Sequence, residues 1–327
     1  MTRALASVPV SFFSIVLGIA GLGNAWTQAH RVWAAPSWIG QLLGWVACAV
    51  WAVLALFYMV KWLVSREAAL AEFRHPVQCC FIGLFPVSGA LITLPLRAFA
   101  PVTAWILAVT TIAAQLAFGV FRTGVLWKGG RDPASNTAVL YLPTVAGSFV
   151  SAIVLSAFGH ADYGKLFFGA GLFSWLAIES VLVHRLYIAP ELSPPLRPTL
   201  GVQLAPPAVA CVAYQAIYDG PPDIFVQALI GYALFQALIL ARLIPWIRKQ
   251  PFAASYWAFT FGASALPAAM IRYVERGGTG VIAESAPYVF VISNLLIAGF
   301  AIGTLWQLAT GRLLAALTPA TPSTAPR

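Results

Sequence analysis

Ten apolar stretches, each long enough to cross a lipid bilayer, follow one another along this 327-residue chain. A helix needs about 20 apolar residues to cross a hydrocarbon core about 30 Å thick. The predicted spans cover residues 8–29, 37–62, 76–96, 101–126, 138–158, 163–187, 199–218, 223–247, 252–272 and 283–310. Because only short loops join them, we predict an all-α integral membrane protein with one transmembrane domain, residues 1–310, and a disordered cytoplasmic tail, residues 311–327.

The composition excludes a soluble domain. Hydrophobic residues make up 60% of the chain and charged residues 9%, whereas soluble domains carry about 25% charged residues. The first span is longer than the apolar core of a cleavable signal, and only Arg3 precedes it. The net charge of +9 is explained by membrane topology and does not call for a nucleic-acid partner.

Lysine and arginine are distributed unevenly between the two sides of the predicted membrane. The N-terminus, the tail and the loops that lead from even to odd spans carry twelve: Arg3, Lys61, Arg66, Arg74, Lys128, Arg131, Arg185, Arg197, Arg248, Lys249, Arg312 and Arg327. The opposite side carries five: Arg31, Arg97, Lys165, Arg272 and Arg276. Basic residues favour the cytoplasmic side, so both termini are predicted to be cytoplasmic.

Interior prolines favour the odd-numbered spans. Pro86, Pro143, Pro206 and Pro267 fall inside spans 3, 5, 7 and 9, and span 1 has Gly18 instead. An interior proline removes a backbone donor and costs about 3 kcal/mol in a regular helix, and glycine also loosens a helix. In a membrane, broken helices occur where protein or a water-filled cavity surrounds them. We interpret these residues as kinks of pore-lining helices; packing kinks of an ordinary bundle are the alternative.

Ten spans with short loops pack naturally as five antiparallel helical hairpins. The odd helices would surround a central pore and the even helices would form an outer ring, although a layered bundle has the same periodicity. Pro245 and Pro287, on even spans, sit near span ends. The odd spans carry no charge between their ends. An apolar lumen of this kind suits weakly hydrated anions if its vestibules are electropositive.

Three charged residues lie within even spans: Arg122, Glu179 and Arg242. Charge inside a membrane is costly and is normally paired. One hypothesis is that Glu179 pairs with Arg122 or Arg242 and leaves one excess positive charge that favours anions. The alternative is a structural clamp between outer helices.

No cofactor or metal site is predicted. The four cysteines lie inside spans without metal-like spacing, and no Walker loop or dinucleotide fingerprint occurs. Histidines lie at span ends, not at matching depth in the membrane: His30, His75, His160 and His184. An intramembrane redox enzyme is therefore only a remote alternative.

Span 9 opens with the segment YWAFTFG. Phe259 and Phe261 are two residues apart, so on a helix they face different directions, and one can point into a lumen while the other packs outward. A phenyl ring over a narrow apolar lumen would block ions. From the residues alone, packing is the commoner role of such an aromatic.

Several motifs together resemble those of the tellurite-resistance/dicarboxylate transporter family, which is related to plant slow-type guard-cell anion channels. They are HPVQCCFIGLFP at 75–86, YLP at 141–143, LFFGAGLFSW at 166–175 with the later Glu179, GVQLAP at 201–206, ARLIPW at 241–246 and YWAFTFG at 256–262. The resemblance implies ten helices, with the odd five around a pore in each protomer of a homotrimer. It also implies that Phe261 is the gate. Val16 stands where the family pattern has a proline.

We therefore predict an anion channel, or a channel-like anion transporter, of the inner membrane. Phe261 would occlude its pore, and the resemblance links it to tellurite resistance. A proton-coupled transporter of C4-dicarboxylates or sulfite on the same fold is the main alternative, and Glu179 is its only mid-span titratable candidate.

Overall fold

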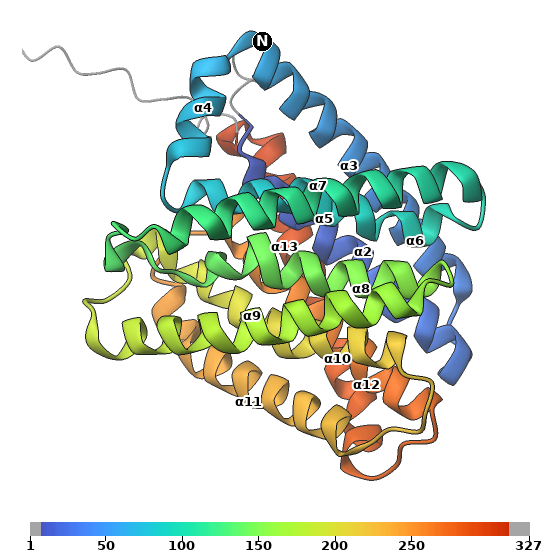
Figure 1. The fold of residues 1–327 in the computed structure, drawn as a ribbon. Helices are drawn as coiled ribbons and strands as arrows, with labels where there is room; N and C mark the ends of the chain where they lie inside the picture. The colour runs from blue at the N-terminus through green and yellow to red at the C-terminus, as the bar shows by residue number, and fades with distance from the viewer. Residues whose placement is uncertain (1–7, 314–327) are drawn as a thin grey trace, which may run out of the picture.

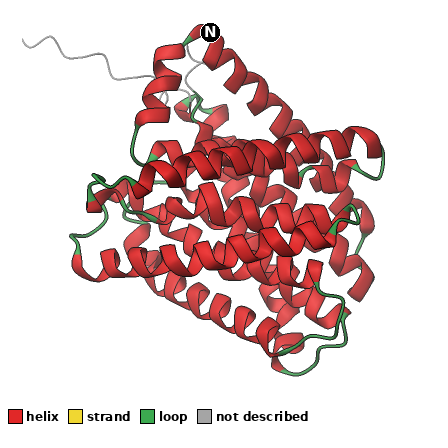
Figure 2. Cartoon of the chain, viewed as in Figure 1, coloured by secondary structure: helices red, strands yellow, loops and turns green. Residues whose placement is uncertain are grey.

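The computed structural model describes residues 8–313, and this part of the chain consists of helices joined by short loops, without strands (Figure 2). The all-α class predicted from the sequence is thus confirmed. Most of the predicted tail lies outside the described residues.

Each odd-numbered span begins with a 3₁₀ segment, of three to eleven residues, and continues as an α-helix. The segments are η1 Val10–Phe12 with α2 Phe13–Trp33; η2 Gln78–Gly83 with α5 Leu84–Leu91 and α6 Thr93–Leu96; η4 Ala138–Tyr141 with α8 Gly147–Ala157; η6 Pro194–Leu204 with α10 Ala205–Ile217; and η7 Ala254–Phe259 with α12 Thr260–Glu275. In the fifth span a π-helical turn, η5 Leu142–Ala146, stands between the two parts. Such departures from α geometry mark strained or functional stretches of helix.

The even-numbered spans are long, unbroken α-helices. They are α3 Ser37–Val64, α7 Pro101–Trp127, α9 Ala161–Ile188, α11 Ile224–Ile247 and α13 Val281–Ala309. Proline at the first position of α7 is tolerated because its missing N–H has no helical partner there. At α11, the Asp223 side chain accepts from the backbone N–H of Val226 at 2.9 Å and caps the helix. Outside the spans lie α4 Arg66–Arg74 and the short η3 Pro133–Ser135.

The two sets of helices differ in burial. In the most apolar window of each span, 61% to 89% of residues are buried for the first, third, fifth and seventh spans, against 17% to 33% for the five even spans. The even helices therefore present their apolar side chains to the lipid, and the odd ones supply the protein interior.

The odd helices contact one another in a closed order. α2 contacts α5, α5 contacts α8, α8 contacts α10, α10 contacts α12, and α12 returns to α2. Each also packs against the even helix that follows it, as α8 packs against α9 (Figure 1). Residues from all parts of the chain thus meet around one central axis.

Nine segments of the described chain are long and apolar enough to cross a membrane. The segment not among them corresponds to predicted span 9, which forms η7 and α12 and is almost wholly buried against α2, α10 and α13. Its crossing of the membrane stays a prediction.

Two details differ from the sequence interpretation. Gly18 does not interrupt α2, which is α-helical from Phe13 to Trp33. A Cβ at Gly18 would instead collide with the side chain of Thr260, so this glycine permits the close approach of α2 and α12. Pro287 is the seventh residue of α13, past its first turn, so interior prolines are not confined to odd spans.

Candidate functional site

An inner cavity of about 130 Å³ opens among the first halves of the odd spans. Every odd span contributes to its wall, through residues that include Leu17, Leu84, Phe149, Val209 and Phe261. By the predicted topology this cavity lies toward the cytoplasm. Its wall is largely apolar and carries a few hydroxyl groups.

An outer cavity of about 600 Å³ lies among the second halves of the same spans. All five odd spans contribute again, through residues that include Ala20, Leu91, Ile153, Val212 and Arg272, and the even helix α3 adds part of the wall from Gly40 to Trp45. Its wall is more polar and includes three arginines. Two cavities therefore occupy the two ends of one ring of helices.

The layer between the cavities is thinnest along α2 and α10. It extends from Leu17 to Ala20 along α2 and from Val209 to Val212 along α10. At 1.5 Å per residue, three residues span about 4.5 Å, or nearly one helical turn. Along α5 and α12 the layer is thicker, from Leu84 to Leu91 and from Phe261 to Arg272.

Phe261 lies at the inner side of this layer. It belongs to the first turn of α12, is 8% exposed and lines the inner cavity. Phe259 points elsewhere and packs against Phe300 of α13, with ring centres 6.3 Å apart. A Cβ on Gly21 of α2 would come within 4.0 Å of the Phe261 ring. The structure therefore places Phe261, not Phe259, at the cavity.

The prolines lie where the odd spans change from one helical geometry to another. Pro86 and Pro206 stand in the first turns of α5 and α10, and Pro143 stands in the π-helical turn. Pro267 differs, because it lies in the middle of α12.

Gln115 of α7 satisfies carbonyl groups of the π-helical turn. Its Nε2 donates to the carbonyl oxygen of Pro143 at 2.8 Å and lies 3.4 Å from that of Leu142. An outer helix thereby supports a broken inner one, as a backbone buried in a membrane requires.

The three intramembrane charges are not brought together. Ion pairs within residues 8–313 do not include Arg122, Glu179 or Arg242. Arg242 is exposed on α11, and Arg122 is buried on α7 with no partner for its Nε within the described chain. The hypothesis that Glu179 pairs with one of these arginines is wrong, because its oxygens face aromatic donors instead.

Glu179 accepts three hydrogen bonds. The hydroxyl of Tyr141 donates to Oε2. The indole N–H of Trp175 also donates to Oε2, at 3.0 Å, and the hydroxyl of Tyr232 donates to Oε1 at 3.0 Å. Tyr141 lies within 2.9 Å of Gln203 as well and lines the inner cavity. The carboxylate thus stands one side chain behind the cavity wall and stabilises it from outside.

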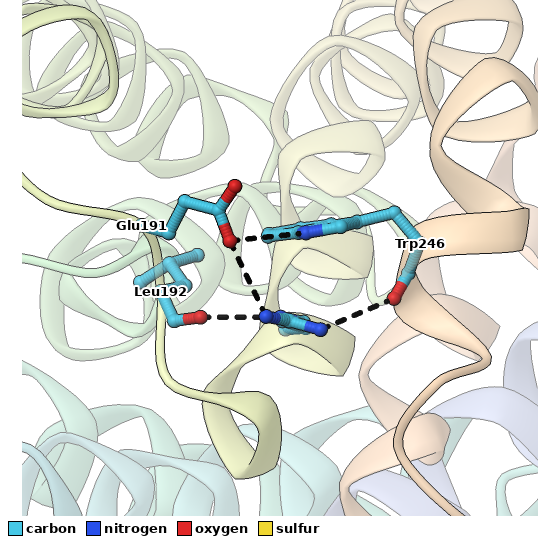
Figure 3. Close-up of polar contacts among 4 residues, drawn as sticks. Glu191, Leu192 and Trp246 are labelled. Carbon is cyan, nitrogen blue, oxygen red and sulfur yellow. Dashed lines mark hydrogen bonds and ion pairs between the residues drawn. The ribbon is translucent and has the colours of Figure 1, made fainter.

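Arg197 fixes another part of that wall. Its guanidinium donates to the carbonyl oxygens of Leu192 at 3.2 Å and Trp246 at 3.5 Å, lies 3.4 Å from the Glu191 carboxylate and stacks 4.4 Å from the centre of the Trp246 ring (Figure 3). Stacking and fork-like donation of this kind suit arginine and not lysine. Arg197 belongs to η6, which also supplies Leu196 to the inner cavity. The contacts of Arg197 therefore hold this part of the cavity wall in place.

Comparison with known proteins decides the family. The model of the family SLAC1, voltage-dependent anion channel, matches residues 7–305. The chain belongs to this family. The resemblance inferred from the sequence motifs is confirmed.

Relatives in the SLAC1 family come from bacteria and plants. The tellurite resistance protein TehA homolog of Haemophilus influenzae is 34% identical over 93% of this chain and 92% of its own length. The S-type anion channel SLAH2 and the guard cell S-type anion channel SLAC1 of Arabidopsis thaliana are 25% and 24% identical over 83% of the chain. The chain spans about half the length of these two plant proteins, 54% and 50%.

For this member of the SLAC1 family, the sequence interpretation missed the polar residues of the outer cavity. Arg272, Arg97 and Gln28 all line it, although the sequence analysis uses the two arginines only as basic residues of the outer side. A signal existed, since Arg272 follows Phe261 by eleven residues, or three helical turns.

Two further features of the described residues concern sulfur groups and metal ligands. Cys79 and Cys80 are free thiols with sulfur atoms 3.9 Å apart. Within residues 8–313, His, Cys, Asp and Glu side chains do not gather in groups of three that could hold a metal.

Proposed function

We propose that the protein is an anion channel of the bacterial inner membrane, and that anions pass along the axis of the ring formed by α2, α5, α8, α10 and α12. One observation carries the proposal: two cavities, each lined by all five odd spans, face each other across a packed layer that is about one helical turn thick where it is thinnest, along α2 and α10. Phe261 borders that layer and is proposed as the gate.

The chemistry of the path favours anions. Its inner wall is apolar, and its outer cavity is lined by Arg31, Arg97 and Arg272 against a single acid, Asp219. A ring of acidic side chains, which cation pores use, is not part of either lining. The excess of basic residues on the predicted cytoplasmic side adds to the attraction at the other mouth.

A proton-coupled transporter of C4-dicarboxylates or sulfite is the weaker candidate. Coupling of this kind needs a titratable group that meets the substrate. Glu179, the candidate named from the sequence, lines neither axial cavity and reaches the inner one only through Tyr141. An intramembrane redox enzyme has no support from the plant relatives, which are named as anion channels.

The family resemblance also suggests assembly as a homotrimer with one pathway in each protomer, and both termini in the cytoplasm follow from the distribution of basic residues. A role in tellurite resistance is proposed only by analogy with the name of the bacterial relative. Crosslinking in native membranes tests the trimer, and labelling of single cysteines placed near each end of the described chain tests the topology.

The selectivity of an opened variant tests the function. In planar bilayers with a tenfold gradient of potassium chloride, Phe261→Ala should give currents that reverse near the chloride equilibrium potential, independent of a pH gradient. Reversal near the potassium potential would refute an anion channel. Transport that follows the pH gradient would favour the coupled transporter.

A further inference from the structure

Three arginines line the outer cavity, and two of them are held by neighbouring protein groups. Arg31 forms an ion pair with Glu275, with Nε and Oε1 2.6 Å apart. Arg97 donates to the backbone carbonyl of Ala157. Arg272, on α12, differs from both: within residues 8–313 its guanidinium takes part in no hydrogen bond or ion pair that meets ordinary distance criteria.

The charges around Arg272 do not neutralise it. Its charged neighbours are Arg276, Glu275, Arg31 and Asp219. Glu275 is engaged by Arg31, and the Asp219 carboxylate lies 3.9 Å from the guanidinium of Arg276 and is fully exposed. Half-buried Arg272 therefore lines the cavity without a carboxylate of its own.

A second polar group of the same cavity also lacks a partner. Gln28 of α2 is 2% exposed, lines the outer cavity, and its amide oxygen has no hydrogen-bond partner within the described chain. Buried polar groups are normally satisfied by protein, water or ligand. The two ends of the amide are nearly the same size. Rotation of the amide by half a turn therefore exchanges the oxygen and the NH₂ group, and the NH₂ group can donate to an anion.

The position of Arg272 along α12 relates it to the proposed gate. Eleven residues separate it from Phe261, which corresponds to three turns and about 16 Å of helix. The two side chains leave α12 on nearly the same side, and Phe261 lines the inner cavity as Arg272 lines the outer one. Arg272 therefore faces the same axis as the proposed gate, on the outer side of the layer between the cavities.

We propose that Arg272, together with Arg97 and the Gln28 amide, forms a binding site for a small inorganic anion such as chloride or nitrate, occupied before the anion crosses the layer at Phe261. A cavity of about 600 Å³ accommodates such an anion with part of its hydration shell. The guanidinium supplies charge-assisted donors, and the amide adds a neutral one. The role in conduction rests on the proposed function, whereas binding to the cavity does not.

Crystals of the wild-type protein grown in bromide test binding directly. Anomalous density is expected in the outer cavity within hydrogen-bond distance of the Arg272 guanidinium, and it should be lost in Arg272→Gln. The matched control is the double variant Lys165→Gln/Asp162→Asn, which removes an exposed ion pair on the same predicted side of the membrane, outside the cavity lining, without changing the net charge, and it should keep the bromide. An empty cavity in the wild type, or bromide that persists in Arg272→Gln, would overturn the site.

Conduction provides a second readout, in which Arg272→Gln and Arg272→Lys are each combined with Phe261→Ala. The Gln variant should raise the external chloride concentration for half-maximal anion influx about fivefold, the factor for losing a unit charge 4 Å away in water. The Lys variant should restore most of the affinity. If Phe261→Ala itself carries no anions, the proposed function fails and the bromide result alone decides on the site. If Phe261→Ala conducts and all three forms share one half-saturation, the site does not serve conduction.

Discussion

Replacement of Glu179 by glutamine separates a structural role of this carboxylate from a role in proton coupling. The side chain accepts from Tyr141, Trp175 and Tyr232 and has no cationic partner within residues 8–313. Glutamine keeps the size of the side chain but replaces one acceptor oxygen with a donor. We expect Glu179→Gln to fold and conduct in the Phe261→Ala background but to be less stable.

The magnitude follows from the hydrogen bonds. Hydrogen bonds to a charged group are worth about 1.5–3 kcal/mol each and neutral ones about 1 kcal/mol. If the new NH₂ group faces Tyr232, that hydroxyl can still accept, as it already does from Gln236 at 2.8 Å, but its own proton loses its acceptor. One charged bond is then lost, two are weakened by about 0.5–2 kcal/mol each, and one neutral bond of about 1 kcal/mol is gained. The net cost is at least about 1.5 kcal/mol, or a factor of about 10 in the unfolding equilibrium.

Unfolding in mixed micelles of increasing sodium dodecyl sulfate, followed by tryptophan fluorescence, measures this change. Glu284→Gln is the control, because Glu284 is exposed in the first turn of α13, and it should change the unfolding equilibrium little. A Glu179→Gln protein as stable as the wild type would refute the role of the carboxylate as a structural acceptor. Normal stability together with loss of pH-dependent uptake would assign Glu179 to proton coupling instead.

Three further substitutions test the packing described above in the same unfolding assay. Lys61→Met should cost about 3–5 kcal/mol, because it leaves buried Glu72 without the ammonium 2.8 Å away, and unchanged stability would contradict this pairing. Gln115→Leu should cost about 1–3 kcal/mol by orphaning the Pro143 carbonyl; a neutral effect would mean that this carbonyl is satisfied otherwise. Gly21→Val should cost about 1–3 kcal/mol by crowding α12, and a fully stable variant would refute the close approach.

The sequence predicted the helical membrane class and the positions of the spans because hydropathy and length depend on composition alone. The prediction is least certain for α12, for the same reason. α12 is less apolar than the other spans because it carries Arg272 and Glu275 near its end and Thr260 and Ser264 near its start. α12 lies inside the protein because other helices pack around it, and the hydropathy of its own residues does not report that packing.

The internal geometry of the spans could be predicted only in part. Prolines located the breaks near α5, α8 and α10, but not the 3₁₀ and π-helical turns around them, because the choice of hydrogen-bond register depends on supporting groups such as Gln115. The partners of Glu179 were missed for a similar reason. An intramembrane charge implies a partner, yet three neutral donors serve a carboxylate as well as one cation.

The central claim is that a path along the ring of odd helices is closed by the side chain of Phe261. Anion conductance of Phe261→Leu and Phe261→Ala, compared with Phe259→Ala as a control of equal size on the other side of the helix, tests it most directly. Conductance should rise as the side chain at 261 shrinks, and the channel should stay closed in Phe259→Ala. Properly inserted Phe261→Ala protein that conducts no more than the wild type would contradict it.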